Sequence, residues 1–512
     1  MSFSFNRRHF VRSSASAAAL AGMAHLPGSP GSPGVASATD AQSSSPDAMV
    51  PLEEDVESLV RMLEDTPRSR LLEEVAGRIQ KGLSYQQILT ALQLAGVRNV
   101  EPRPSVGFKF HSVLVVYSAH QASIGGADQH RWLPIFWALD YFKATQAQDA
   151  REGDWTMAPV DEGSVPPAER ASKMFIEAMD RWDEAKADVA VASLGRHLGA
   201  QSVFDHFARY AGRDYRSIGH KAIFVSNAWR TLQCAGWRFA EPVLRSLAYA
   251  LLNHTGEGNP AENDYEADRP WRENQELVTK IRPDWTEGRL DDQATVELLE
   301  VLRNDSYSEV CRLAVKMLNE GISPQSLWDA VFVGAGELLM RQPAIVALHA
   351  STTTNALHYL YTAAADDRTR RLLLLQNLAF LPMFRQSMRG RGRVQDVRID
   401  QLEAAETADS PAEQVEAIFA DVGRDAASAA RRTLAYAQDD PTGLDFVRKA
   451  RELIALKSRT SHDFKYSSAV LEDYASVSPA WRPAHLASTV YMLLGTSRAD
   501  NPLIGRTIEA LA

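Results

Sequence analysis

Residues 82–89, Gly-Leu-Ser-Tyr-Gln-Gln-Ile-Leu, carry the start signal of a helix and return later in the chain. Ser84, followed three residues later by Gln87, has the form of a capping box, in which each side chain accepts a hydrogen bond from a free backbone amide. Residues 321–328, Gly-Ile-Ser-Pro-Gln-Ser-Leu-Trp, match this stretch 239 residues later and put a proline at the first helical position. The two stretches predict a helical fold with an internal repeat.

The rest of the chain has the periodicity of helices. From about residue 53 onward, apolar residues recur at steps of three and four, as at Val56, Leu59, Val60 and Leu63. The alternation that is typical of strands is scarce. We therefore expect an all-α, multi-helical fold in which two duplicated helical halves pack together.

Histidine landmarks repeat in the same order in both halves. The matched pairs are His111 with His349, His120 with His358, and His220 with His462. Trp-Arg dipeptides follow at 237–238 and 481–482, so the separation between partners stays between 238 and 244 residues. A single match would be unremarkable, whereas several in one order favour a duplication over coincidental similarity between amphipathic helices.

The chain is expected to have five parts. They are a signal peptide at 1–38, a linker at 39–52, a first helical half at 53–255, a connecting segment at 256–297 and a second helical half at 298–512. The linker is assigned because residues 39–50 are rich in serine, alanine and aspartate.

The first 38 residues resemble a twin-arginine export signal. Arg7-Arg8 precedes Phe10-Val11, an alanine-rich apolar stretch follows, and residues 36–38, Ala-Ser-Ala, have the form of a signal-peptidase site. The apolar stretch is too short for a stable membrane span, and no run of about 20 apolar residues occurs elsewhere. We expect export by the twin-arginine machinery to the periplasm or the exterior, with no stable membrane insertion.

Composition excludes several classes of protein. The chain has 512 residues, 45% of them hydrophobic, which rules out a disordered chain. Its net charge of -10 argues against nonspecific nucleic-acid binding, which needs a basic face. Its two cysteines, Cys234 and Cys311, cannot form a disulfide framework or a four-thiolate metal site.

The repeated histidines are the main candidates for chemistry, because neutral imidazole is both a metal ligand and a proton shuttle near pH 7. The expected catalytic residues are His220, His349, His462 and Lys465, and the expected metal ligands are His111, His120, His349 and His358. Nine residues turn a helix by about 900°, so one straight helix cannot aim His111 and His120 at one metal. Either that helix is interrupted or the two histidines serve different neighbours.

Other candidates are weaker. Lys221 could hold an anionic substrate or a reduced oxygen species, or it could be a solvated charge at a helix end. The Trp-Arg pairs at 237–238 and 481–482 could clamp a planar ligand or form packing corners. Glu241 and His485 occupy matching places and could add ligands to iron or another divalent metal.

Standard catalytic motifs are missing from the sequence. It contains no Gly-x-Ser-x-Gly elbow, no His-Glu-x-x-His zinc helix, no Walker loop, no Glu-x-x-His pair and no Cys-x-x-Cys-His haem motif. Four other short motifs occur in order. They are Leu194-Gly195 before Phe204, Phe207 and Tyr210; His220-Lys221-Ala222-Ile223; Leu348-His349-Ala350-Ser351-Thr352; and His462-Asp463-Phe464-Lys465.

Through these motifs, most of residues 100–495 resembles the questin oxidase-like family. The chain departs from the family pattern where Val113 and Leu114 replace a closely spaced second histidine after His111. The resemblance implies an oxidoreductase, with Baeyer–Villiger-type oxygen insertion into a ketone or quinone ring as the family's activity, using NADPH and O₂. No nucleotide-binding fold is recognised in the sequence, and NADPH would be scarce outside the cytoplasm.

We therefore expect an exported, monooxygenase-like oxidoreductase that acts on an aromatic or apolar small molecule through a histidine-lined pocket between the halves. A redox metal such as iron is a possible cofactor, and NADPH rests on the resemblance alone. The alternatives are a non-catalytic helical scaffold and a metal- or haem-binding carrier. A scaffold predicts that His111, His220, His349 and His462 are scattered, whereas an enzyme or a carrier predicts that they converge.

Overall fold

The helices begin at the capping residues that the sequence predicts. In the computed structural model, Ser84 and Gln87 form the reciprocal hydrogen bonds of a capping box at the start of α4 (Tyr85–Asn99). The hydroxyl of Ser323 accepts the backbone N–H of Gln325 at the start of α15 (Pro324–Arg341). These caps fix where two long, largely buried helices enter the core.

The structure describes residues 49–102, 109, 111–254, 258–406 and 410–512. Within these ranges the regular structure is helical, and the one β pairing is an isolated bridge between Arg289 and Ile322. The predicted all-α, multi-helical class is confirmed. None of the described helices is long and apolar enough to cross a membrane. The expected signal peptide at 1–38 and residues 39–48 of the expected linker lie outside the described residues.

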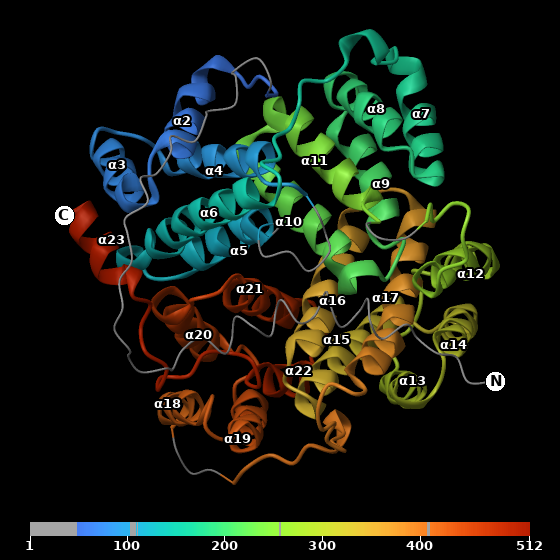
Figure 1. Cartoon of the computed structure of the whole chain (residues 1–512). Helices are drawn as coiled ribbons and strands as arrows, with labels where there is room; N and C mark the ends of the chain where they lie inside the picture. Colours follow the sequence, from blue (N-terminus) through green and yellow to red (C-terminus); the bar gives the residue numbers. More distant parts are fainter. Residues whose placement is uncertain (1–48, 103–108, 110, 255–257, 407–409) are drawn as a thin grey trace.

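The chain forms two successive series of helices (Figure 1). The first comprises α2 (Glu54–Asp65), α3 (Arg68–Gln80), α4, α5 (His111–Gly125), α6 (Leu133–Glu152), α7 (Ala168–Arg181), α8 (Glu184–His197), α9 (Ala200–Ala211), α10 (His220–Ala235), α11 (Ala240–Leu252) and α12 (Arg269–Leu277). The second comprises α13 (Asp292–Asn304), α14 (Tyr307–Asn319), α15, α16 (Ile345–Ala363), α17 (Asp367–Met388), α18 (Pro411–Asp421), α19 (Ala426–Asp439), α20 (Leu444–Lys457), α21 (Ser461–Ser476), α22 (Arg482–Thr489) and α23 (Leu503–Leu511).

Helices in corresponding places of the two series have corresponding neighbours. α8 packs against α7 and α11, and α19 packs against α18 and α22. Likewise α4 packs against α2, and α15 packs against α13. An internal duplication would produce this scheme, and the duplication itself stays a prediction.

The last helix of each series packs on the other series. α12, which lies within the expected connecting segment at 256–297, contacts α14 and α17, while α23 contacts α3 and α6 (Figure 1). Arg506 of α23 forms an ion pair with Glu73 of α3 at 2.7 Å. The two series therefore hold each other through exchanged terminal helices.

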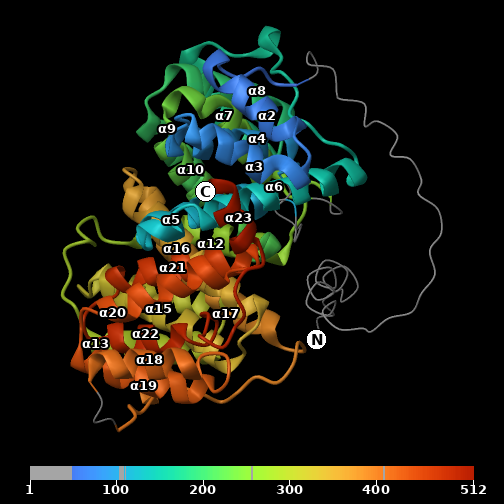
Figure 2. The ribbon, with the colours of Figure 1, turned by 90° about the vertical axis from the view of Figure 1, so that its left-hand side faces the viewer.

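Four helices form a closed ring where the two series meet, and we call them the central ring. α5 contacts α10, α10 contacts α16, α16 contacts α21, and α21 contacts α5. Figure 2 shows these four helices between the upper, first-series part of the molecule and its lower, second-series part. Each series contributes two of them, so any site inside the ring depends on both.

Candidate functional site

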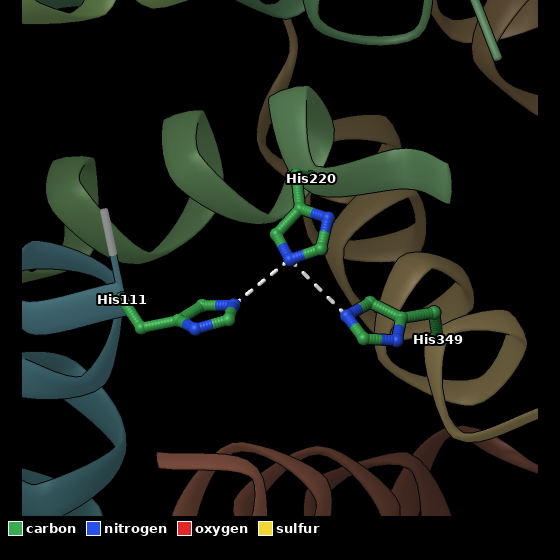
Figure 3. Close-up of side chains that lie close together, drawn as sticks. All are labelled: His111, His220 and His349. Atoms are coloured by element: carbon green, nitrogen blue, oxygen red, sulfur yellow. Dashed lines mark hydrogen bonds between the residues drawn. The ribbon is translucent and has the colours of Figure 1, made fainter. Parts of the chain in front are cut away.

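Four histidines that are far apart in the sequence meet inside the central ring. His111 and His220 are the first residues of α5 and α10, His462 is the second residue of α21, and His349 lies in the second turn of α16. The Nε2 atom of His220 lies 2.9 Å from Nε2 of His111 and 3.2 Å from Nε2 of His349 (Figure 3). The His462 ring stands edge-on to the rings of His111 and His349, with centroids 4.8 and 5.2 Å away. The histidines converge, and the scattered arrangement that a scaffold predicts is not found.

Backbone carbonyls decide which ring nitrogens of this cluster carry hydrogen. Nδ1 of His220 lies 2.6 Å from the carbonyl oxygen of Ser217, and Nδ1 of His349 lies 2.7 Å from that of Ile345. A carbonyl oxygen only accepts, so each Nδ1 is protonated and donates. In a neutral imidazole the Nε2 atom then presents a lone pair. His220 and His349 therefore bring two lone-pair nitrogens within 3.2 Å of each other, an arrangement that a cation between them would stabilise.

The imidazoles are held in the neutral form. Burial, together with the nearby charge of Lys465, lowers the pKa of His220 to about 3. Burial, the neighbouring histidines and the same lysine charge also place the pKa values of His111, His349 and His462 well below the ordinary histidine value. The positive ends of α5, α10 and α21 act in the same direction, because they disfavour a further positive charge. Neutral imidazole is the form that binds a metal ion.

Three of the four histidines have the arrangement of a metal-binding set. One nitrogen from each of His111, His220 and His349 lies within 4.8 Å of the others. Nitrogens 2.9 and 3.2 Å apart can share one ion at metal–nitrogen distances of about 2.0–2.1 Å. The Nδ1 bonds to Ser217 and Ile345 are of the kind that usually orient a ligating histidine.

The carbonyl group of Ser217, which orients His220, lies in a strained turn. Ser217, Ile218 and Gly219 have φ values of 56°, 49° and 81°, so three successive residues are left-handed. A β-branched residue such as Ile218 rarely adopts this conformation, and strain of this kind persists where the surrounding structure enforces it. A Cβ atom at Gly219 would overlap the side chain of Thr353 on α16, so glycine permits the close approach of α10 and α16.

The structure places two expected metal ligands away from the cluster. α5 runs without interruption from His111 to Gly125, so His120 faces other neighbours. Its Nδ1 atom lies 3.0 Å from the hydroxyl of Tyr85, and its Nε2 atom lies 3.7 Å from Sγ of Cys234. His358 packs edge-on against Trp328. Of the expected set of four, the structure brings together His111 and His349, and His220 joins them.

The remaining candidates serve packing and charge pairing. Glu241 forms an ion pair with Arg196, and Nε2 of His485 lies 3.1 Å from the carbonyl oxygen of Val470. Arg238, of the first Trp-Arg pair, forms an ion pair with Asp55. None of these contacts reaches the histidine cluster.

The two lysines beside the cluster differ in their partners. Lys221 is buried, donates to the carboxylate of Asp214 at 2.7 Å and lies over the ring of Trp182, so it braces the start of α10. Lys465 lies one turn beyond His462 on α21 and is 2% exposed. Its Nζ atom and the buried Nε2 atom of His462 have no hydrogen-bond partner among the described residues. Burial lowers the pKa of Lys465 to about 7.

Replacing Lys465 by methionine is expected to stabilise the metal-free protein by about 1–2 kcal/mol. The change keeps an unbranched side chain of similar length and removes a buried donor that lacks an acceptor. Lys143 is the matched control, because its Nζ atom donates to the backbone carbonyls of Leu63 and Glu64. The Lys143→Met change should lower the free energy of unfolding. Urea denaturation at pH 7 measures whether the free energy of unfolding rises in Lys465→Met and falls in Lys143→Met.

His485 is expected to make the protein acid-sensitive. Burial lowers the pKa of His485 to about 4. The unfolded chain therefore takes up the proton first, and this part of the stability is lost as the pH falls from about 6.5 toward 4. Between pH 7 and pH 5 this contribution of His485 to the free energy of unfolding falls by about 2 kcal/mol. The His485→Gln variant lacks the contribution, so its stability should fall by about 2 kcal/mol less than that of the unaltered protein. Urea unfolding at both pH values tests this, with the exposed His197→Gln as control.

Comparisons with protein-family models, with curated proteins and with solved structures found no match. The function is therefore inferred from the histidine cluster. Its rings lie with centroids 4.5 to 5.2 Å apart, which leaves room between them for an ion rather than for an aromatic ring. The cluster is a candidate metal centre.

Proposed function

We propose that this protein is an exported, metal-dependent oxidoreductase whose metal is held by His111, His220 and His349. The observation that carries the proposal is the pair of lone-pair Nε2 atoms of His220 and His349, which lie 3.2 Å apart while both Nδ1 atoms donate to carbonyls. A cation between them would be bound by both nitrogens. Three neutral imidazoles suit iron, copper, zinc or nickel better than magnesium or calcium, which prefer oxygen ligands.

The residues around the set support a reactive centre rather than a closed structural one. Three protein ligands leave a coordination position open, as catalytic sites do. The carbonyls of Ser217 and Ile345 hold two of the imidazole rings in place. The side chains of His111, His220 and His349 are buried. When bound, a redox metal would supply electron transfer to dioxygen or to an organic molecule. His462 and Lys465 would hold or move protons at Nε2 and Nζ.

The resemblance to the questin oxidase-like family supports an aromatic or other apolar substrate and monooxygenase-like chemistry. By that resemblance alone, NADPH would be the reductant. The twin-arginine-like start of the chain supports export to the periplasm or the exterior. These three points are parts of the proposal that depend on the sequence.

The test is metal analysis and dioxygen uptake on protein purified after native export. About one redox metal per chain, with dioxygen uptake in the presence of quinols or other aromatic donors, is the expected result. The His349→Ala variant should lose both properties, whereas the His358→Ala variant should keep both. Metal-free protein that nevertheless turns over these donors would contradict the proposal.

A carrier is the second candidate, because the tight packing of the four rings favours an ion over a bulky substrate. It predicts the same metal content and the same loss in His349→Ala, without dioxygen uptake. A carrier of haem would instead show the haem absorption spectrum after purification.

A further inference from the structure

Two buried polar atoms beside the three-histidine set have no hydrogen-bond partner among the described residues. They are Nζ of Lys465 and Nε2 of His462, one helical turn apart on α21. Lys465 is 2% exposed, and its charge influences all four imidazoles of the cluster. An ammonium group can donate three hydrogen bonds, and burying it with none is costly. A ligand that accepts hydrogen bonds is the missing partner.

The charge around the cluster shows which kind of ligand would fit. The neighbouring charges with the largest effects on the pKa values of the four imidazoles are those of Lys465 and of the imidazoles themselves. α5, α10 and α21 add the positive ends of their dipoles. A metal held by three neutral imidazoles keeps its full charge. In a buried site such an excess of positive charge is unfavourable unless an anion accompanies it.

We propose that Lys465 and His462 form a subsite for a small anion, of the size of azide or formate, which also fills the open coordination position at His111, His220 and His349. Coordination of the anion to the metal rests on the proposed function, whereas its binding at Lys465 and His462 rests on the two unpartnered atoms. The imidazole centroids lie 4.5 to 5.2 Å apart, and this close packing favours an anionic group of only a few atoms. Such a group could be the carboxylate of an organic substrate or an anion derived from dioxygen.

Azide and formate titrations test the subsite on the metal-free protein and on the protein loaded with Co²⁺. We expect both anions to bind, and azide to shift the visible spectrum of the Co²⁺ form. Lys465→Met should weaken azide binding about 10- to 100-fold, which is the loss of affinity expected when one charge-assisted hydrogen bond is removed. Lys143→Met, at the buried lysine that donates to carbonyls, should leave the azide affinity unchanged.

The outcomes separate the subsite from the metal. Co²⁺ binding without any azide effect, or an azide affinity that Lys465→Met and His462→Phe both leave intact, would overturn the subsite and leave the metal proposal standing. Azide binding that needs Lys465 in a protein that takes up no Co²⁺ would support the subsite and overturn the metal proposal. Competition by benzoate would identify an organic carboxylate as the ligand, and competition by peroxide alone would identify an oxygen-derived anion.

Discussion

Replacing His220 by alanine is expected to weaken metal binding by at least about 100-fold. His220 is the central member of the set, because its Nε2 atom is the near neighbour of both His111 and His349. Loss of a residue that merely orients a metal ligand already costs about 10- to 100-fold in affinity, and loss of a ligand costs more. Competition with a coloured chelator measures the affinity of each variant directly.

His120→Ala is the matched control for this change. His120 is a partly buried histidine on the same helix as His111, but it contacts Tyr85 and Cys234 instead of the cluster. The control should keep the affinity of the unaltered protein. Equal affinities in the His220 and His120 variants would mean that the metal binds elsewhere.

Replacing Gly219 by alanine is expected to destabilise the protein by about 2–5 kcal/mol. The left-handed φ of 81° costs a residue with a side chain about 1–2 kcal/mol, and crowding a packed site costs about 1–3 kcal/mol more. The added Cβ atom would overlap Thr353, so relief requires α10 and α16 to separate. That movement would also pull His220 away from His349. Urea unfolding and metal titration should therefore both report a loss.

Gly82→Ala separates the cost of the left-handed backbone from the cost of crowding against Thr353. Gly82 also has a positive φ, 99°, but a Cβ atom there meets nothing within 4 Å. The control should lose about 1–2 kcal/mol from the backbone term and keep its metal affinity. Equal losses in the two variants would show that contact with Thr353 does not hold the site together.

The repeated histidines show how much of the site could be predicted from the sequence. Their order in two halves identified three matched pairs, and the structure brings together four of these six residues, His111, His220, His349 and His462. Helix geometry also predicted that His111 and His120 could not face one metal unless the helix between them was interrupted. It could not show which of the two would point inward, because that depends on the packing of α5 against α10 and α21.

Two further features had no signal in the sequence. The tautomers of His220 and His349 depend on carbonyls placed by a left-handed turn and by the first turn of α16. Serine and isoleucine, the residues at 217 and 218, do not predict a left-handed turn. The exchange of α12 and α23 between the series is likewise a matter of tertiary packing, which helical periodicity does not specify. Caps such as Ser84 were predictable because they act within one turn.

The most direct measurement is X-ray absorption at the metal edge, on protein loaded with one equivalent of Co²⁺ or Fe²⁺. We expect three imidazole nitrogens at about 2.0–2.1 Å, and two in the His220→Ala variant at saturating metal. The remaining position should respond to azide. A first shell of water and carboxylate oxygens, or one that the His220→Ala change leaves untouched, would contradict a metal centre built from His111, His220 and His349.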